Sequence, residues 1–153
     1  MTADSTMVSR KVDSGFVSNG ALILLGRFFF TIIFLLVGPN LFTKAEIAAD
    51  AAQGIPFASV VVPLAGAISL VGGLSVLLGY RAKIGAWLMV LFLVVVTPSM
   101  HKFWGLADPK VAQLQMIMFL KNLSILGGAF LITQFGAGPF SLDSRRPRRT
   151  RNM

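Results

Sequence analysis

Residues 113–135 constrain this chain more than any other part of the sequence, because the stretch is long and apolar and yet carries Lys121 and Asn122 near its middle. About 20 apolar residues are enough for a helix to cross a bilayer. A lysine at the centre of such a helix costs on the order of 3 kcal/mol, and intramembrane charges face neighbouring helices or a wet cavity. The stretch therefore predicts a helix that lies among other helices, with a polar spot between them.

Three further segments are apolar and long enough to cross a membrane, at about 20–41, 57–78 and 84–103. Their apolar residues do not alternate at period two, which excludes a β-barrel and favours helices. With 55% hydrophobic and only 13% charged residues, the composition is not that of a soluble domain. We therefore predict an all-α, four-helix transmembrane bundle in up-down-up-down order over residues 20–138. A mostly disordered N-terminal tail (1–19) and a basic C-terminal tail (139–153) would flank it.

The connection between the first two spans contains a candidate interfacial helix. Thr43 is a good N-cap residue, and Glu46 follows three positions later, as in a capping box. Ile47 and Ala51 would then share one apolar side. The pattern predicts a short helix lying in the membrane interface after the first span.

Basic residues set the expected orientation. Four crossings place both termini and the second connection on one side, where there are nine lysines and arginines, against three on the other side. The positive-inside rule then puts both termini in the cytoplasm, and we expect a plasma-membrane protein. The five-arginine C-terminal tail is expected to lie on anionic lipid. Nucleic acid is excluded as a partner, because most basic residues lie outside the apolar segments.

Two cations, Arg27 and Lys121, lie inside the apolar segments, whereas all six acids lie in tails or loops. By depth, Arg27 could bond Ser69 or backbone carbonyls, or extend to lipid phosphate. The candidate partners of Lys121 are Asn122, Ser124, Thr97, Ser99 and His101. One interpretation is that both cations are structural. The other is a ligand site for something electron-rich, such as a quinone carbonyl, an anionic headgroup or a small anion.

The single histidine, His101, is followed by Lys102, Phe103 and Trp104 at the expected end of the third span. This group is typical of an interfacial aromatic belt, although His101 and Trp104 could also line a quinone site. The chain has no cysteine, and no cluster of His, Asp and Glu has metal-ligand spacing. We therefore predict no metal and no catalytic residue, with quinone as the one candidate cofactor.

Several short motifs between Gly26 and Asp143 resemble those of the DoxX family of small four-helix membrane proteins. They are Gly26-Arg27, Gly54-Ile55-Pro56, residues 70–87, His101-Lys102-Phe103-Trp104, Phe119-Leu120-Lys121-Asn122 with Gly127-Gly128, Gly136-Ala137-Gly138 and Ser141-Leu142-Asp143. The resemblance implies a subunit of a quinone-linked redox complex. It also implies a glutamate before the Leu-x-Gly-Gly of the second helix, where this chain has Ser69, so that Arg27 lacks the family's counter-ion.

Three functions remain open from the sequence. The first is a non-catalytic subunit of a quinone-linked membrane redox complex, with a quinone or lipid site at Lys121, Asn122 and His101. The second is a small anion transporter or channel with Arg27 and Lys121 along its path. The third is a ligand-free scaffold or assembly factor. Redox subunits or further copies of the chain are the candidate protein partners.

Overall fold

Every element of the chain described by the structure is helical. The structure is a computed structural model that describes the backbone of residues 3–145 and the side chains of residues 20–145. In chain order the elements are α1 (Ala3–Val37), the 3-10 helix η1 (Gly38–Phe42), α2 (Lys44–Ala52), α3 (Ala58–Leu78), α4 (Ala82–Met100) and α5 (Pro109–Phe135). Four candidate spans are long and apolar enough to cross a membrane, one in each of α3, α4 and α5 and one at Gly20–Phe42. The predicted all-α class with four spans is confirmed.

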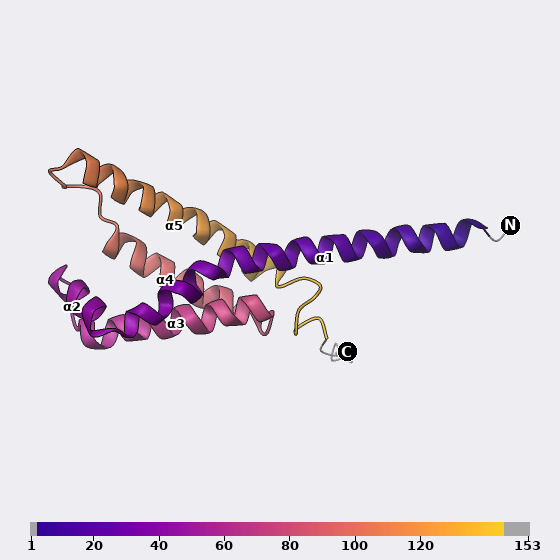
Figure 1. Ribbon diagram of the computed structural model, residues 1–153, viewed down its shortest axis with the longest axis horizontal. Helices are drawn as coiled ribbons and strands as arrows, with labels where there is room; N and C mark the ends of the chain where they lie inside the picture. Colours follow the sequence, from indigo (N-terminus) through magenta and orange to yellow (C-terminus); the bar gives the residue numbers. More distant parts are fainter. Residues whose placement is uncertain (1–2, 146–153) are drawn as a thin grey trace, which may run out of the picture.

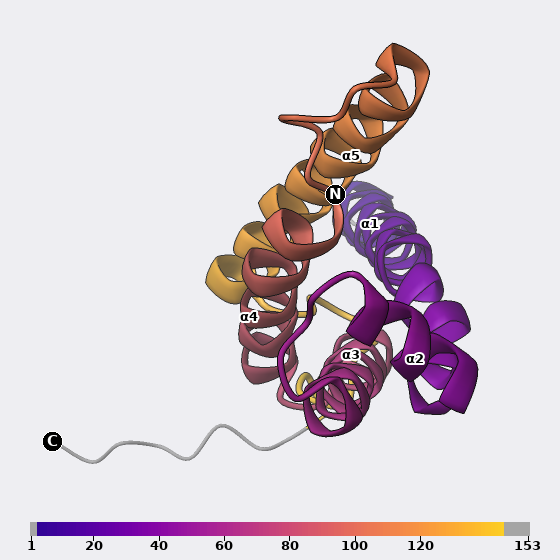
Figure 2. The same cartoon turned by 90° about the vertical axis from the view of Figure 1, so that its left-hand side faces the viewer.

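Membrane spans that follow one another in the chain pack side by side. α1 packs on α3, α3 on α4, and α4 on α5 (Figures 1 and 2). Met89 and Leu93 of α4 form the centre of the core, together with Phe34 of α1 and Ala129 of α5. α1 and α5 lie close together near the C-terminal end of α5 and diverge toward α2 (Figure 1). We call these the terminal end and the α2 end.

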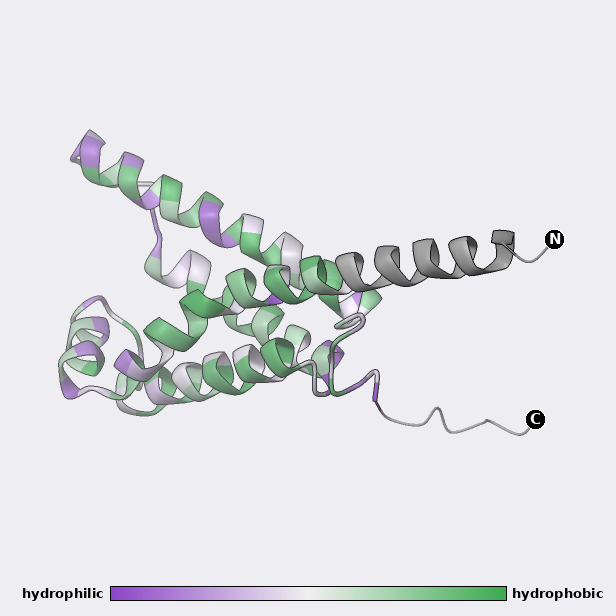
Figure 3. Cartoon of the chain, turned by 45° about the vertical axis from the view of Figure 1, so that its right-hand side comes forward, coloured by the Kyte–Doolittle hydropathy of each residue, from purple (hydrophilic) through white to green (hydrophobic). Residues whose placement is uncertain are grey.

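The spans consist mostly of hydrophobic residues (Figure 3), and many of these are exposed. Leu22 is 70% exposed, Val60 66% and Leu131 61%. At most a third of any span's residues are buried within the chain, between 11% and 33%. Contiguous apolar surface of this extent is not stable in water, so lipid must cover it. The protein is therefore a multi-pass integral membrane protein.

The structure corrects the expectation that the helix at 113–135 lies among the others. α5 is at the edge of the bundle, with 11% of its span buried, against 33% for α3 and α4. Small residues explain why α3 and α4, rather than α5, pack closely at the centre of the bundle. A Cβ added at Gly72 of α3 would lie 3.1 Å from the carbonyl oxygen of Gly85 in α4, so only glycine permits this close backbone approach.

The expectation of a disordered N-terminal tail is wrong for residues 3–19, which continue α1. This stretch contains no proline, and a helix already nucleated by the adjacent span extends at little cost. Residues 1–2 and 146–153 lie outside the described part. The proposed contact of the C-terminal arginines with lipid falls mostly there and stays a prediction, as do the domain boundaries.

The short helix expected after the first span is confirmed as α2. The Oγ1 of Thr43 accepts a hydrogen bond from the backbone N–H of Glu46 at 3.2 Å, as the capping pattern predicts. α2 packs on η1 and α3. The way α2 packs on α3 decides which side chains of α2 point toward the bundle.

A strap of residues 136–144 closes the terminal end. Both carboxylate oxygens of Asp143 accept bonds from the first N–H groups of α4, those of Arg81 at 2.8 Å and Ala82 at 2.9 Å. The N–H of Asp143 donates to the carbonyl of Gly79 at 2.8 Å. A carboxylate at a helix N-terminus satisfies unpaired donors and complements the helix dipole. The strap therefore ties the chain's end to the α3–α4 turn.

Gly79→Ala is expected to destabilise the protein. Gly79 has a φ of +64°, and a Cβ there would collide with Nη1 of Arg27 and with Ser141. The left-handed conformation alone costs roughly 1–2 kcal/mol for a residue with a Cβ. We expect the melting temperature of the purified protein in detergent to fall by roughly 4 °C or more.

The matched control is Gly127→Ala. Gly127 lies within α5, and an added Cβ would have nothing within 4 Å. Alanine there should leave stability unchanged or raise it by up to about 1 kcal/mol, because alanine favours helix. Equal melting temperatures for the two variants would contradict the packing of the strap on Gly79.

Candidate functional site

An apolar cavity lies at the α2 end, lined by α2, α3, α4 and the junction of α1 with η1. It has a volume of about 460 Å³, within the range of roughly 300–1,000 Å³ typical of ligand sites. Its lining is mostly aliphatic with a few polar groups, from Val37, Leu41, Glu46, Asp50, Ile55, Pro56, Val61, Val62, Ala65, Phe92, Val95, Val96, Ser99, Met100 and His101. Val61 and Val95 are 40% and 52% exposed on the outer surface. The cavity therefore borders the lipid-facing side of the protein.

Two carboxyl groups of α2 line this cavity. Glu46 and Asp50 are four residues apart and so lie on one face of the helix. Asp50 is only 5% exposed, and its Oδ1 is buried without a hydrogen-bond partner among the described residues. Burial raises the pKa of Asp50 above its usual value, and the neighbouring Glu46 raises this pKa further. A buried carboxyl left without a partner marks a functional candidate.

His101 joins this cavity to a smaller one of about 170 Å³. The two cavities share Val37, Leu41, Phe92, Val96 and His101, and together we call them the α2 cleft. Nδ1 of His101 lies 2.9 Å from Oε1 of Gln115 in α5. This contact ties the C-terminal end of α4 to α5 beside the smaller cavity.

The smaller cavity brings together four of the residues singled out by sequence, namely Ser69, His101, Lys121 and Asn122. Asn122 is 9% exposed. Lys121 is exposed, and its Nζ lies 3.3 Å from the sulfur of Met118. Lys121 therefore lines the smaller cavity from its exposed side, and its ammonium has a weak acceptor as its neighbour.

Arg27 lies elsewhere, under the strap at the terminal end. Its Nη2 donates to the carbonyl of Phe140 at 2.7 Å, while Nε and Nη1 have no partner among the described residues. The hydroxyl of Ser69 donates to the carbonyl of Phe34 at 3.3 Å rather than meeting Arg27. Neither cavity of the cleft is lined by Arg27. The geometry therefore gives Arg27 and Lys121 no common path.

Trp104 is also outside the cleft. It is 54% exposed and packs edge-on against Phe103 and Phe119, with ring centroids 5.2 and 6.2 Å apart. Edge-to-face aromatic packing of this kind stabilises a loop locally. The arrangement matches an aromatic group near the membrane surface.

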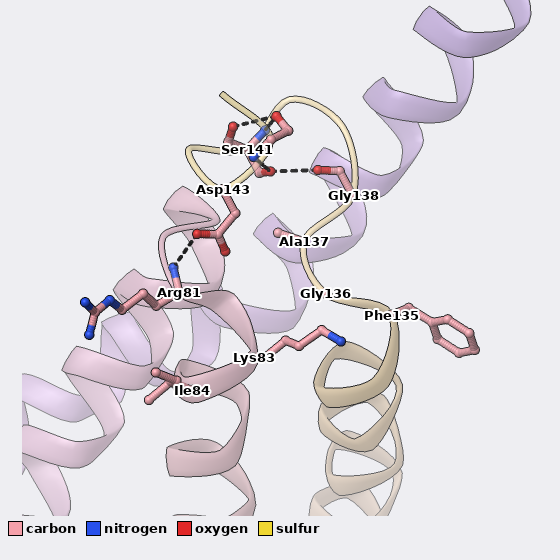
Figure 4. Close-up of a pocket in the computed structure, with 10 residues that line it drawn as sticks. Arg81, Lys83, Ile84, Phe135, Gly136, Ala137, Gly138, Ser141 and Asp143 are labelled. Carbon is pink, nitrogen blue, oxygen red and sulfur yellow. Dashed lines mark hydrogen bonds between the residues drawn. The ribbon is translucent and has the colours of Figure 1, made fainter. Parts of the chain in front are cut away.

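A third hollow, of about 580 Å³, lies beside the strap (Figure 4). Its polar groups already hold the fold together. Asp143 caps α4, and Nζ of Lys83 donates to the carbonyl of Gln134 at 2.7 Å. This hollow is therefore a weaker candidate for a ligand site than the α2 cleft.

Within the described residues, no group of three or more His, Cys, Asp or Glu could hold a metal ion.

The fold and the cleft define the class of this protein as a multi-pass helical membrane protein with a pocket open toward the bilayer. A family model described as the SURF4 family matches residues 19–148. The chain belongs to the SURF4 family. It is 29% identical over 79 residues to the ER-derived vesicles protein ERV29 of Saccharomyces cerevisiae, an alignment that covers 52% of this chain and 25% of the yeast protein. No solved structure matches the chain.

The resemblance to the DoxX family is wrong, because the family model that covers most of the chain is that of the SURF4 family. The structure explains why the motifs misled. Gly72 permits close helix packing, and Asp143 caps a helix. Four-helix membrane bundles of any family need such devices, so these motifs identify an architecture more than a lineage.

Sequence reasoning missed the acidic side of the cleft. It placed Glu46 and Asp50 in a connection, gave Glu46 only a role in capping the short helix, and gave Asp50 no role. The available signal was their spacing of four within a short helix that was otherwise rich in alanine. Whether α2 turns this face toward α3 or toward solvent depends on packing, which the spacing does not specify.

Asp50→Asn is expected to stabilise the ligand-free protein. Because burial raises the folded-state pKa of Asp50, the wild type loses stability as pH rises from the ordinary value of 3.8 through that raised pKa. Asparagine keeps a buried polar group but removes the charge, so at neutral pH the substitution should recover about 1 kcal/mol or more of the cost of burying an unpaired carboxylate. The gain in melting temperature should be larger at pH 7.5 than at pH 4, where the raised pKa keeps much of the wild-type carboxyl protonated.

Asp108→Asn is the control, because Asp108 is exposed and its Oδ1 accepts from the N–H of Lys110 at 2.8 Å at the start of α5. Asparagine caps helices about as well as aspartate, so little change is expected. If Asp50→Asn lowered the melting temperature at both pH values, the carboxylate would have a partner and the description of the cleft would be wrong.

Proposed function

We propose that this chain is a non-catalytic membrane protein that binds an amphipathic ligand from the bilayer in the α2 cleft. The observation that carries the proposal is the cleft itself. It has apolar walls from α3 and α4 and polar groups gathered at the α2 end, and exposed Val61 and Val95 lie on its lipid-facing side. This combination suits a molecule with an apolar body and a polar head.

The proposed cellular setting comes from the relative. The yeast protein is named for ER-derived vesicles. We propose that this chain likewise works in a membrane that forms transport vesicles, rather than in the plasma membrane, with both termini facing the cytoplasm. The basic-residue count supports that orientation, with nine lysines and arginines on the terminal side against three on the other.

Filling the cavity tests ligand binding. Ala65 lines the larger cavity on α3, and Ala65→Phe should occupy much of its volume. We expect amphipathic molecules retained by the wild type after gentle purification to fall at least tenfold in this variant. Mass spectrometry of the extracted small molecules, lipids and quinones included, measures the loss.

Val71→Phe is the matched control, because Val71 is on the same helix and 58% exposed outside the cavity. It adds a similar apolar bulk that lipid can accommodate. Retention should equal that of the wild type. An identical set of bound molecules in all three proteins would show that the cleft holds no ligand.

Cell fractionation tests the setting. A tagged full-length chain expressed in yeast is expected to co-purify with ER-derived vesicles budded in vitro. Recovery in the plasma-membrane fraction, with none in budded vesicles, would contradict the proposed role in vesicle formation.

A further inference from the structure

The chemistry of the cleft specifies more than an apolar body, because its charge is unevenly distributed. The residues lining the larger cavity include two acids, Glu46 and Asp50, and no lysine or arginine. Lys121 lines the smaller cavity instead. The two parts of the cleft therefore present opposite charge to a bound molecule.

Asp50 is the second observation that points to a ligand. Its side chain is only 5% exposed, and its Oδ1 lacks a hydrogen-bond partner among the described residues. Leaving a buried carboxyl unpaired costs stability, and such groups persist where they serve binding. An ammonium group would supply both the missing hydrogen bond and the missing charge.

The apolar walls fix the rest of the molecule. From Phe92 to Met100 the α4 wall extends roughly 12 Å at 1.5 Å per residue. Val62 and Ala65 of α3 line the cavity across from it. A single chain or slender apolar body would fit along these walls, with its head at α2.

We propose that the α2 cleft selects a lipophilic primary amine, with its ammonium group bound between Asp50 and Glu46 and its apolar body along α3 and α4. Lys121 repels the ammonium from the smaller cavity and so helps to orient the ligand. This inference rests on the proposed function and adds the charge of the head group. It concerns a membrane-soluble amine rather than a protein partner.

The test uses the purified full chain in nanodiscs of zwitterionic phosphatidylcholine, which do not attract amines by surface charge. Dodecylamine, dodecanol and dodecanoate are compared at pH 7.5 by native mass spectrometry. The three probes share one tail length and differ in head group. We expect dodecylamine to bind at least tenfold more tightly than dodecanol, and dodecanoate to bind most weakly.

Two variants locate the preference. Asp50→Asn and Glu46→Gln should each reduce the amine-over-alcohol ratio at least threefold, whereas Asp108→Asn should retain the wild-type ratio. Ala65→Phe should weaken all probes alike. Because Asp50→Asn is expected to be more stable than the wild type, lost amine binding would not reflect unfolding.

The outcomes separate the two proposals. If dodecanol binds as tightly as dodecylamine, or if Asp50→Asn leaves the ratio unchanged, the amine preference is wrong while the cleft still binds apolar molecules. If no probe binds the wild type, both the amine preference and the proposed function fail.

Discussion

The absence of water around the spans governs this structure, because a polar group there can be satisfied only by a partner within the protein. The hydroxyl of Thr31 donates to the carbonyl of Arg27 at 2.7 Å, and the hydroxyl of Ser69 bonds across to α1. Arg27 reaches the carbonyl of Phe140 in the strap. Each bond links a buried side chain to a backbone carbonyl, so helix positions and polar satisfaction are set together.

The two ends of the bundle meet this requirement differently. At the terminal end, the carboxylate of Asp143 pairs with two N–H groups of α4 and the strap covers the helix ends. At the α2 end, helices α1 and α5 diverge and Asp50 keeps a buried oxygen without a partner. Nε and Nη1 of Arg27 also lack partners among the described residues at the terminal end, but only Asp50 lines the apolar cavity, where a ligand can reach its carboxylate.

The SURF4 family model covers both ends of the bundle, since it matches residues 19–148. The motifs that suggested another family perform structural work at the terminal end and between α3 and α4. Gly79, for example, must be glycine both for its positive φ and for the space taken by Arg27. Residues constrained by packing in this way recur wherever the architecture does, so they carry little information about ligands.

The sequence alone determined the membrane class, the four spans and the cap of α2, because hydropathy and capping are local properties that need no knowledge of neighbours. It also identified Ser69, His101, Lys121 and Asn122, which the smaller cavity brings together. Only the tertiary structure decided that α4 rather than α5 is central, that Arg27 lies under the strap, and that Asp50 is buried in a cavity. These depend on which helix faces meet, and in lipid that choice follows from side-chain fit between distant segments, which hydrophobicity does not encode.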